Sequence, residues 1–348
     1  MRLTNNQRVA ILLHDGIRGE GGKTGLTFLR YRAATVVAVI DKQCAGESLS
    51  ELTGIACHAP IVDSVASALA YHPDVLLIGI APSGGKLPDA WKLEIKQGVA
   101  AGLSVINGLH TLMASDPELQ GLLRENQVIW DIRQEPAGLG VGSGKARSLT
   151  CGRILTVGTD MGVGKMSASL ELNRSALRRG IRAKFLATGQ AGIMISGEGI
   201  PLDAIRVDFA AGAVEQLVMN SCDNHDLLIV EGQGSLFHPA STATLPLIRG
   251  TQPTGLILVH RAGQTHIRNH QHVPIPPLPE VIKLYEAVAS AGGAFADVKV
   301  KAIALNTGHL DDTAAQQAIE QVKKDTGLPC SDAIRFGADI LLDSAYSA

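Results

Sequence analysis

The sequence predicts an α/β protein with two parallel-sheet domains, and three observations support this prediction. Short apolar runs rich in β-branched residues alternate with longer amphipathic stretches over most of the 348 residues. Hydrophobic residues make up 45% of the chain and aromatic residues only 3%, while glycine occurs 38 times. Small residues of this kind let helices and ligands approach a sheet closely. The length also favours two domains over one.

The first half, residues 1–135, is expected to form a Rossmann-like domain. Each apolar run is closed by Gly, Pro or Asp, and segments with helical spacing separate several of them. This alternation predicts a parallel sheet covered by helices. Strands are expected at 8–13, 35–40, 75–80, 104–106 and 128–130, and helices at 87–102 and 117–125.

The composition then changes. The segment Pro136-Ala-Gly-Leu-Gly-Val-Gly-Ser-Gly144 has no periodicity and too much glycine for an element interior, so residues 136–150 are predicted to be a linker. Residues 151–348 resume the alternation and are expected to form a second α/β domain. Its strands are expected at 153–157, 183–187, 227–230, 256–259 and 298–305, and its helices at 164–179, 201–220, 279–291 and 312–326.

Composition also narrows the partners. The formal net charge is −2, and no basic stretch interleaves with aromatic residues, so we expect no nucleic-acid partner. The apolar run 9–13 is too short for a signal sequence, and nothing approaches a membrane span, which predicts a cytoplasmic protein with no membrane partner. Apolar, alanine-rich helices suggest a homo-oligomer. The five cysteines form no C-x-x-C pair and are expected to be free thiols.

The most specific local pattern is Gly158-Thr-Asp-Met-Gly-Val-Gly-Lys165, which joins an expected strand to an expected helix. Backbone N–H groups and a helix N-terminus attract an anion, glycines allow it to come close, and a lysine adds mobile positive charge. The pattern therefore predicts that the phosphates of a nucleotide-like ligand bind here. The residues expected to bind this cofactor are Thr159, Asp160, Gly162, Val163, Gly164, Lys165, Met166 and Ser167.

Met166 bears on the chemistry of this loop. The general pattern G-x-x-x-x-G-K-[ST] has a hydroxyl residue after the lysine, which would ligate Mg²⁺. A thioether is a poor ligand for that cation, and a helical side chain one position later turns by about 100°. We therefore expect nucleotide hydrolysis to be weak or absent and predict no metal site. The loop suits a diphosphate that is not cleaved, such as that of coenzyme A.

Two further residues are candidates for catalysis. Glu231 ends a strand-like run, so it is expected in the same crevice as Lys165. There it would act as a base toward an amine or hold Mg²⁺, or it would be a structural partner of Lys165. His238 follows in a loop rich in Ser, Thr and Pro, where an imidazole would shuttle a proton or serve only the structure.

Other polar residues at strand ends are candidates for substrate or base contacts. Arg261 and His266 belong to a basic segment, expected as an extended loop, that would clamp a carboxylate or phosphate. Gln190, in an expected flexible loop at 188–199, and Lys86 would contact an acidic small-molecule substrate. Asn306 either reads the edge of a nucleobase or forms a turn.

The N-terminal domain offers a weaker alternative. Asp41 ends the second expected strand, where Rossmann proteins place an acid that binds ribose. The glycines at 19–22 do not follow the dinucleotide spacing, and Ile17 stands where a second P-loop would need glycine. An NAD-binding role therefore rests on Asp41 alone.

The sequence resembles, over nearly its full length, a bacterial and archaeal family long known only as a domain of unknown function, which includes D-glutamate N-acetyltransferase. The C-terminal half is also similar to dethiobiotin synthetase, a P-loop protein that usually works as a dimer. The resemblance rests on the phosphate loop with Lys-Met at its end and on Lys23-Thr24, Val39-Ile-Asp41, Ile80-Ala-Pro-Ser-Gly-Gly-Lys86, Ala187-Thr-Gly-Gln190, Glu231-Gly-Gln-Gly-Ser-Leu-Phe-His-Pro239, Pro274-Ile-Pro-Pro-Leu-Pro279 and Leu305-Asn-Thr307.

This resemblance implies an N-acyltransferase that moves an acetyl group from acetyl-CoA to the amino group of D-glutamate or a similar acidic amino acid. The phosphate loop would bind cofactor phosphates, and Glu231 or His238 would deprotonate the amine. Two alternatives remain. One is a carboxylate ligase that uses ATP and Mg²⁺, like dethiobiotin synthetase. The other is a non-enzymatic nucleotide-binding sensor that dimerises around ATP.

Overall fold

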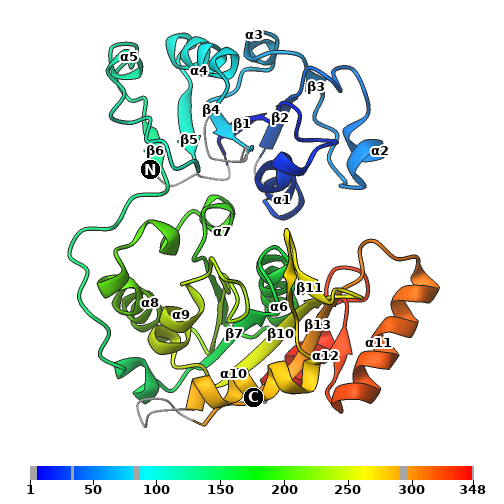
Figure 1. Ribbon diagram of the computed structural model, residues 1–348. Coiled ribbons are helices and arrows are strands. Elements are labelled where there is room, and N and C mark those ends of the chain that lie inside the picture. The colour runs from blue at the N-terminus through cyan, green and yellow to red at the C-terminus, as the bar shows by residue number, and fades with distance from the viewer. Residues whose placement is uncertain (1–5, 33–34, 81–86, 291–296, 347–348) are drawn as a thin grey trace. The chain divides into compact units, whose positions relative to one another are not determined.

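The computed structural model describes residues 6–32, 35–80, 87–290 and 297–346. The chain divides into two compact units, each shown in Figure 1. The first contains Met1–Gln134 together with Ile193–Pro201, and the second contains Glu135–Gly192 and Leu202–Ala348. Within the described ranges, no helix is both long enough and apolar enough to span a bilayer.

The first unit is built on a parallel sheet, as the alternation predicts. Over the residues described, six strands lie in the order β3-β2-β1-β4-β5-β6, and every adjacent pair is parallel. The order reverses between β1 and β4, which is the doubly wound Rossmann arrangement. The strands are β1 (Arg8–Leu12), β2 (Thr35–Ile40), β3 (Ile61–Val62), β4 (Val75–Ile78), β5 (Ser104–Asn107) and β6 (Ile129–Asp131).

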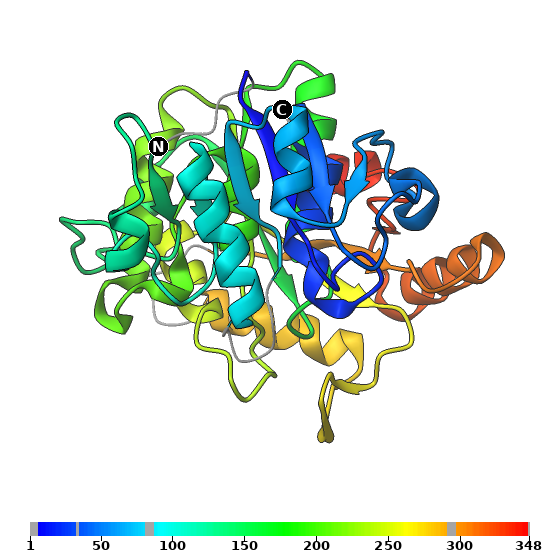
Figure 2. The ribbon, with the colours of Figure 1, turned by 90° about the horizontal axis from the view of Figure 1, so that it is seen from above.

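Local capping explains where several helices of this unit begin. The side chains of Ser48, Ser64 and Asp116 accept hydrogen bonds from the first-turn N–H groups of α2, α3 and α5. Helices α3 and α4 lie side by side near the sheet (Figure 2). The helices are α1 (Lys23–Tyr31), α2 (Leu49–Thr53), α3 (Val65–Ala68), α4 (Asp89–Ala101) and α5 (Pro117–Gln120), with 3-10 turns η1 (Glu20–Gly22) and η2 (Leu69–Tyr71).

The second unit has a parallel sheet of its own. In the described part of the chain its strand order is β14-β13-β10-β7-β9-β8, again with parallel pairing throughout. Strand β7 therefore lies between β9 and β10, and the loops that follow these three strands emerge at one edge. The strands are β7 (Gly152–Gly158), β8 (Ala183–Leu186), β9 (Leu227–Val230), β10 (Gly255–Arg261), β13 (Val300–Asn306) and β14 (Cys330–Ser331).

Helices pack against this sheet through apolar residues. Helix α6 and the C-terminal helix α12 contribute Leu172, Leu341 and Leu342 to a buried cluster with β7, β9, β10 and β13. Helices α8 and α9 pack together, and α11 lies at the β14 edge (Figures 1 and 2). The helices are α6 (Lys165–Arg178), α8 (Val207–Cys222), α9 (Thr244–Thr251), α10 (Leu278–Ser290), α11 (Asp312–Thr326) and α12 (Asp339–Ala345), with the 3-10 turns η3 (Lys145–Ser148) and η4 (Leu202–Ala204).

Two segments expected as loops are ordered elements. Helix α7 (Gln190–Ser196) occupies most of the segment predicted to be flexible. Strands β11 (His266–Ile267) and β12 (His270–Pro274) form an antiparallel hairpin where an extended loop was expected. Glycines at 189, 192 and 197 obscure the helical signal of α7, and polar histidines obscure the alternation of the hairpin.

The expectation of five free thiols is wrong for two cysteines. Cys151 and Cys222 form a disulfide with a Cα–Cα distance of 5.8 Å, and Cys44, Cys57 and Cys330 are free. The bonded residues are 71 positions apart, so no local spacing signals the pair. Folding brings them together because one directly precedes β7 and the other ends α8. Burial raises the pKa of Cys330 to about 12, which keeps that thiol protonated.

The segment predicted as a linker is held against α8. Buried Glu215 accepts hydrogen bonds from the backbone N–H groups of Ser143 (2.7 Å), Lys145 and Ala146 (3.4 Å), and from the Ser143 hydroxyl (3.0 Å). Burial raises the pKa of Glu215, but these hydrogen bonds outweigh that effect and lower it. A Cβ at Gly212 would lie 1.9 Å from the Gly140 carbonyl oxygen, so the approach also requires glycine.

Replacing this carboxylate tests whether the segment is part of the fold. Glu215→Gln keeps the side-chain volume but removes the charge and leaves one acceptor oxygen for several donors. We expect a loss of about 2 kcal/mol in the free energy of unfolding, measured by urea denaturation at pH 7. Glu320→Gln, at an exposed position of α11, is the control and should leave the midpoint unchanged. Equal midpoints for both variants would show that Glu215 contributes little.

Candidate active site

The phosphate loop leaves β7 at Gly158 and enters α6 at Lys165. Two of its glycines have left-handed backbone angles, with φ of 70° at Gly162 and 115° at Gly164. The N-cap of α6 is Gly164, which has no side chain to satisfy the first N–H groups of this 14-residue helix. The loop therefore presents backbone donors at the positive end of a helix, which is the arrangement that binds a phosphate.

Lys165 lies over the loop with only 6% of its surface exposed. Its Nζ donates a hydrogen bond to the Asp160 carbonyl oxygen at 2.7 Å. A Cβ at Gly158 would lie 3.0 Å from this Nζ, and a Cβ at Gly232 would lie 1.8 Å from the Thr156 carbonyl oxygen. The backbone clash excludes any side chain at Gly232, and a side chain at Gly158 would press on Lys165.

Asp160 ties the loop to the segment that follows β10. Its carboxylate is fully buried and accepts hydrogen bonds from Met161 N (2.6 Å), Gln264 Nε2 (2.6 Å) and Arg268 N (2.7 Å). Arg268 is the first residue of the turn between β11 and β12. The position of this hairpin is therefore fixed to that of the phosphate loop.

Thr159 is fully buried and faces β10. Its hydroxyl lies 2.9 Å from Nδ1 of His260, which is also buried. Burial lowers the pKa of His260 to about 4, so this imidazole is neutral at pH 7. The threonine supports the loop from within the sheet.

The loop after β9 is attached to the same backbone. Ser235 donates a hydrogen bond to the Thr159 carbonyl oxygen at 3.0 Å. The Tyr285 hydroxyl donates to the Gly158 carbonyl oxygen at 2.7 Å and accepts from Leu236 N at 3.2 Å. Burial raises the pKa of Tyr285, so the phenol stays protonated and remains a donor. These bonds fix residues 232–238 beside the phosphate loop.

Glu231 lies immediately after β9, with 3% of its surface exposed. One carboxylate oxygen accepts hydrogen bonds from Thr188 N (2.9 Å) and Gly189 N (3.2 Å), and the other accepts from Gln233 Nε2 (3.2 Å). A Cβ at Gly192 would lie 2.3 Å from the first oxygen. Glu231 therefore organises the turn that leads into α7.

His238 is nearly buried, at 8% exposure. Its Nδ1 accepts a hydrogen bond from Ala240 N at 3.1 Å. Its ring lies 5.0 Å from the ring of His270, measured between centroids, and His270 lies 5.9 Å from His272. The loop after β9 and the hairpin thus bring two imidazoles into contact.

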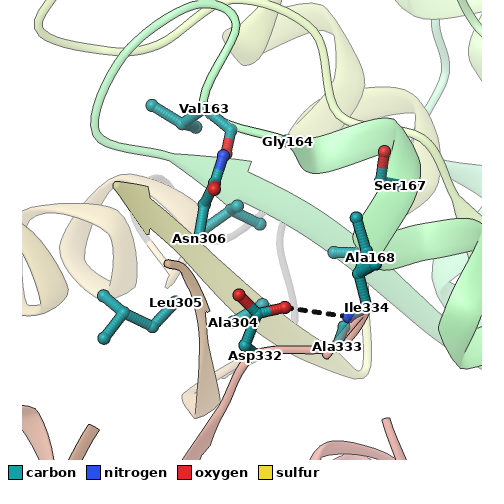
Figure 3. Close-up of a pocket in the computed structure, with 11 residues that line it drawn as sticks. Val163, Gly164, Ser167, Ala168, Ala304, Leu305, Asn306, Asp332, Ala333 and Ile334 are labelled. Carbon is teal, nitrogen blue, oxygen red and sulfur yellow. Dashed lines mark hydrogen bonds between the residues drawn. The ribbon is translucent and has the colours of Figure 1, made fainter. Parts of the chain in front are cut away.

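A pocket opens beside the phosphate loop (Figure 3). Asn306 lies at its edge, where Nδ2 donates to the Val163 carbonyl oxygen (2.9 Å) and Oδ1 accepts from Gly308 N (3.1 Å). Ser167, on α6, lies on the wall of this pocket. The lining residues are Val163, Gly164, Ser167, Ala168, Val259, Ala304, Leu305, Asn306, Asp332, Ala333 and Ile334.

The remaining predicted substrate residues lie on elements at or near the same edge. Arg261 is exposed at the end of β10, and His266 begins β11 with Nδ1 3.0 Å from the Thr265 hydroxyl. Gln190 begins α7 and is half-buried. Lys86 lies outside the described residues.

In the first unit, Asp41 organises a turn. Its carboxylate is buried and accepts hydrogen bonds from Ile17 N (3.2 Å) and Gln43 N (3.1 Å). These contacts give Asp41 a structural role. Separately, the described ranges contain no group of three or more His, Cys, Asp and Glu residues placed to hold a metal ion.

Several site residues have no signal of their own in the sequence. Tyr285 lies on α10 without a motif, and Gln264 joins the site only through Asp160. His270 belongs to a histidine-rich run, but nothing in that run indicates which ring meets His238. These residues can be recognised only once the strand order is known, because the strand order decides which segments lie beside the phosphate loop.

Comparisons with known proteins agree with this architecture. Residues 140–342 match the family described as a domain of unknown function (DUF1611_C), P-loop domain. Residues 42–135 match its companion, described as the DUF1611_N Rossmann-like domain. The crystal structure of a DUF1611 family protein from Anabaena variabilis is 64% identical in sequence and superposes with a TM-score of 0.96. That match covers 98% of this chain and 99% of the other.

Two similar proteins carry functional names. A protein named D-glutamate N-acetyltransferase from Tritonibacter scottomollicae is 39% identical over 275 residues, covering 77% of this chain and 80% of that protein. Another of the same name from Pseudoalteromonas sp is 35% identical over 281 residues, covering 80% and 83%. Both similarities extend over more than two thirds of each chain.

The buried imidazole predicts a dependence of stability on pH. Because the pKa of His260 falls from 6.5 to about 4 on folding, the unfolded chain binds a proton between these pH values that the folded chain does not. The contribution of neutral His260 to the free energy of unfolding is therefore fully present above pH 6.5. It is lost as the pH falls toward 4, and the total loss is about 3 kcal/mol. His260→Asn keeps a polar group near Nδ1 without this titration. Its unfolding free energy should fall less between pH 7 and pH 4.5 than that of the wild type, and parallel curves would contradict the assignment.

Proposed function

This chain belongs to the DUF1611 family, and we propose that it moves an acetyl group from acetyl-coenzyme A to the amino group of D-glutamate or a similar acidic amino acid. The two proteins named D-glutamate N-acetyltransferase support an N-acetyltransferase, since they share 39% and 35% of their residues with this chain over most of its length. Their names do not specify the acetyl donor or where it binds, so the support for these two points must come from the geometry of the site.

The proposal rests mainly on the N-terminus of α6, which follows two glycines and has Lys165 above it and Met166 after it. The positive φ at Gly162 and Gly164 and the absence of a capping side chain at Gly164 fit a phosphate held by backbone amides. Half-buried Met166 supplies no oxygen ligand for Mg²⁺. The residues therefore fit a diphosphate that is held and not hydrolysed, and coenzyme A carries such a group.

The pocket in Figure 3 lies beside the phosphate loop, and we assign it to the nucleobase of the cofactor. Its walls are mostly small and apolar, including Ala168, Ala304 and Ala333, which suits a flat aromatic ring. The Asn306 amide uses one donor and one acceptor on the backbone of its neighbours and retains one N–H and one lone pair. We assign those remaining groups to the edge of the adenine.

When bound, acetyl-coenzyme A supplies a thioester whose carbonyl carbon is the electrophile that the amine attacks. The chain must hold the acidic acceptor by its carboxylates, and Arg261, His266 and Gln190 are our candidates for that role. Arg261 is exposed at the carboxyl end of β10, and Gln190 is half-buried at the start of α7. A guanidinium and an imidazole at one edge complement an acid with two carboxylates.

The amine must also lose a proton, and the hydrogen bonds separate the two predicted candidates. The oxygens of Glu231 already accept from Thr188 N, Gly189 N and Gln233 Nε2, which makes Glu231 the organiser of the α7 turn. Nδ1 of His238 accepts from Ala240 N, so its other nitrogen carries the proton of the neutral ring. We therefore assign positioning to Glu231 and hydrogen-bond donation to His238.

An assay with purified protein tests the reaction. Free thiol should appear from acetyl-coenzyme A only when D-glutamate is added, and mass spectrometry should show N-acetyl-D-glutamate in equal amount. L-glutamate at the same concentration tests selectivity for the D form. Release of phosphate from ATP with an acidic acceptor, without thiol, would instead identify a ligase. Tight ATP binding without turnover of either donor would identify a sensor.

Lys165→Met tests the phosphate site separately from turnover. The substitution keeps the length of the side chain and removes its charge, so we expect coenzyme A to bind at least about tenfold more weakly by calorimetry, as for loss of a charge-assisted hydrogen bond. Lys324→Ala, on the exposed face of α11, is the control and should bind as the wild type does. Unchanged affinity in Lys165→Met would move the phosphates away from this loop.

A further inference from the structure

Two loops that carry histidines are both anchored to the phosphate loop. Ser235, three residues before His238, donates a hydrogen bond to the Thr159 carbonyl oxygen. The backbone N–H of Arg268, two residues before His270, donates a hydrogen bond to the Asp160 carboxylate. The rings of His238 and His270 meet with their centroids 5.0 Å apart and their planes inclined by 58°. Because each loop is tied to adjacent residues of the phosphate loop, this pair is part of the same edge of the sheet.

The backbone contacts of the two rings favour opposite neutral tautomers. Nδ1 of His238 lies 3.1 Å from Ala240 N, a group that only donates, so Nδ1 holds a lone pair and Nε2 holds the proton. Nδ1 of His270 lies 3.4 Å from the Arg268 carbonyl oxygen, which only accepts. This contact favours the neutral tautomer of His270 that has its proton on Nδ1 and its lone pair on Nε2.

We propose that His270 is the general base of the acetyl transfer and that His238 donates a hydrogen bond to the acyl oxygen. This assignment rests on the proposed function. It follows from the tautomers, since a base needs a ring nitrogen with an available lone pair and a hydrogen-bond donor needs one with a proton. The difference in burial between the two rings also agrees with these roles. His238 is nearly buried and so held in place, whereas half-buried His270 is open to an incoming amine.

Nε2 of His270 takes one proton from the ammonium group of the amino acid and later releases it to solvent. The lone pair of the resulting amine forms the new N–C bond, and the C–S bond breaks with its electron pair on sulfur. A second proton from the nitrogen completes the thiol. Nε2–H of His238 faces the acyl oxygen, where negative charge develops. His238 donates a hydrogen bond to this oxygen and keeps its own proton.

The neighbouring histidines provide the comparison. His272 is exposed on β12, 5.9 Å from His270 between ring centroids, and does not contact His238 in the ring contacts of the described residues. His266 has its Nδ1 3.0 Å from the Thr265 hydroxyl, a group that both donates and accepts, so neither tautomer is imposed. Unlike His266, His270 has a backbone carbonyl beside its Nδ1, and this partner favours a lone pair on Nε2.

The tautomers are measured without any substrate. In ¹⁵N spectra of protein labelled at histidine, protonated and unprotonated ring nitrogens resonate apart, and His238→Gln and His270→Gln assign the two signals. Neutral His238 should show protonated Nε2 and neutral His270 should show protonated Nδ1. The same tautomer at both residues, or the reverse of this pattern, would overturn the proposal even if the enzyme is active.

Kinetics supplies the second test. His270→Gln should lower kcat for D-glutamate about 100-fold or more, with KM for acetyl-coenzyme A changed no more than about twofold. His272→Gln is the matched control on the same strand and should keep wild-type kcat. Thermal unfolding followed by circular dichroism establishes that both variants are folded. Wild-type kcat in folded His270→Gln overturns the proposal.

The role of His238 has its own pair of variants. His238→Gln retains an N–H donor near the position of Nε2, whereas His238→Ala has none. The glutamine variant should keep kcat at least about tenfold above the alanine variant, since one donor to a developing oxyanion has an effect of that order or larger. Equal rates would remove the donor role. If wild-type protein releases no thiol at all, the proposed function fails, while the spectra still decide the tautomers.

Discussion

The buried carboxylate of Asp160 is the contact on which the arrangement of the site depends. It accepts hydrogen bonds from its own loop and from the segment after β10, while its backbone carbonyl accepts from Lys165. One residue thus fixes the phosphate loop, the position of the lysine and the hairpin that carries His270. A buried carboxylate with hydrogen-bond donors on both oxygens is strongly favoured in this geometry, because an unsatisfied charge would be costly.

The strand order explains why these groups meet. Strand β7 has β9 and β10 as neighbours, so the three loops at its carboxyl end are adjacent although they are far apart in the sequence. Gly158 and Gly232 allow them to approach, since a side chain at either position would meet Lys165 or the β7 backbone. Tyr285 and Ser235 then hold the middle loop in place. The chemistry proposed for this edge follows from three loops placed by one sheet.

The parts predicted from sequence are those set by local pattern. Alternation of apolar runs and helical stretches identifies both parallel sheets, and the order strand, glycine loop, lysine, helix identifies the phosphate loop. Contacts between distant segments had no such signal. The Cys151–Cys222 disulfide, the docking of residues 143–146 on Glu215 and the engagement of Asp160 all depend on tertiary neighbours. Helix α7 was missed because its glycines weaken the helical pattern, and its turn is completed by Glu231.

We propose that the loop at 158–165 holds the phosphates of coenzyme A while the adjacent histidines face the acyl group. A crystal structure with coenzyme A and D-glutamate bound tests this directly. We expect diphosphate density at the N-terminus of α6 within hydrogen-bond distance of Lys165 Nζ, and the amino group of D-glutamate near His270. Coenzyme A bound elsewhere, with its diphosphate away from α6, would contradict it.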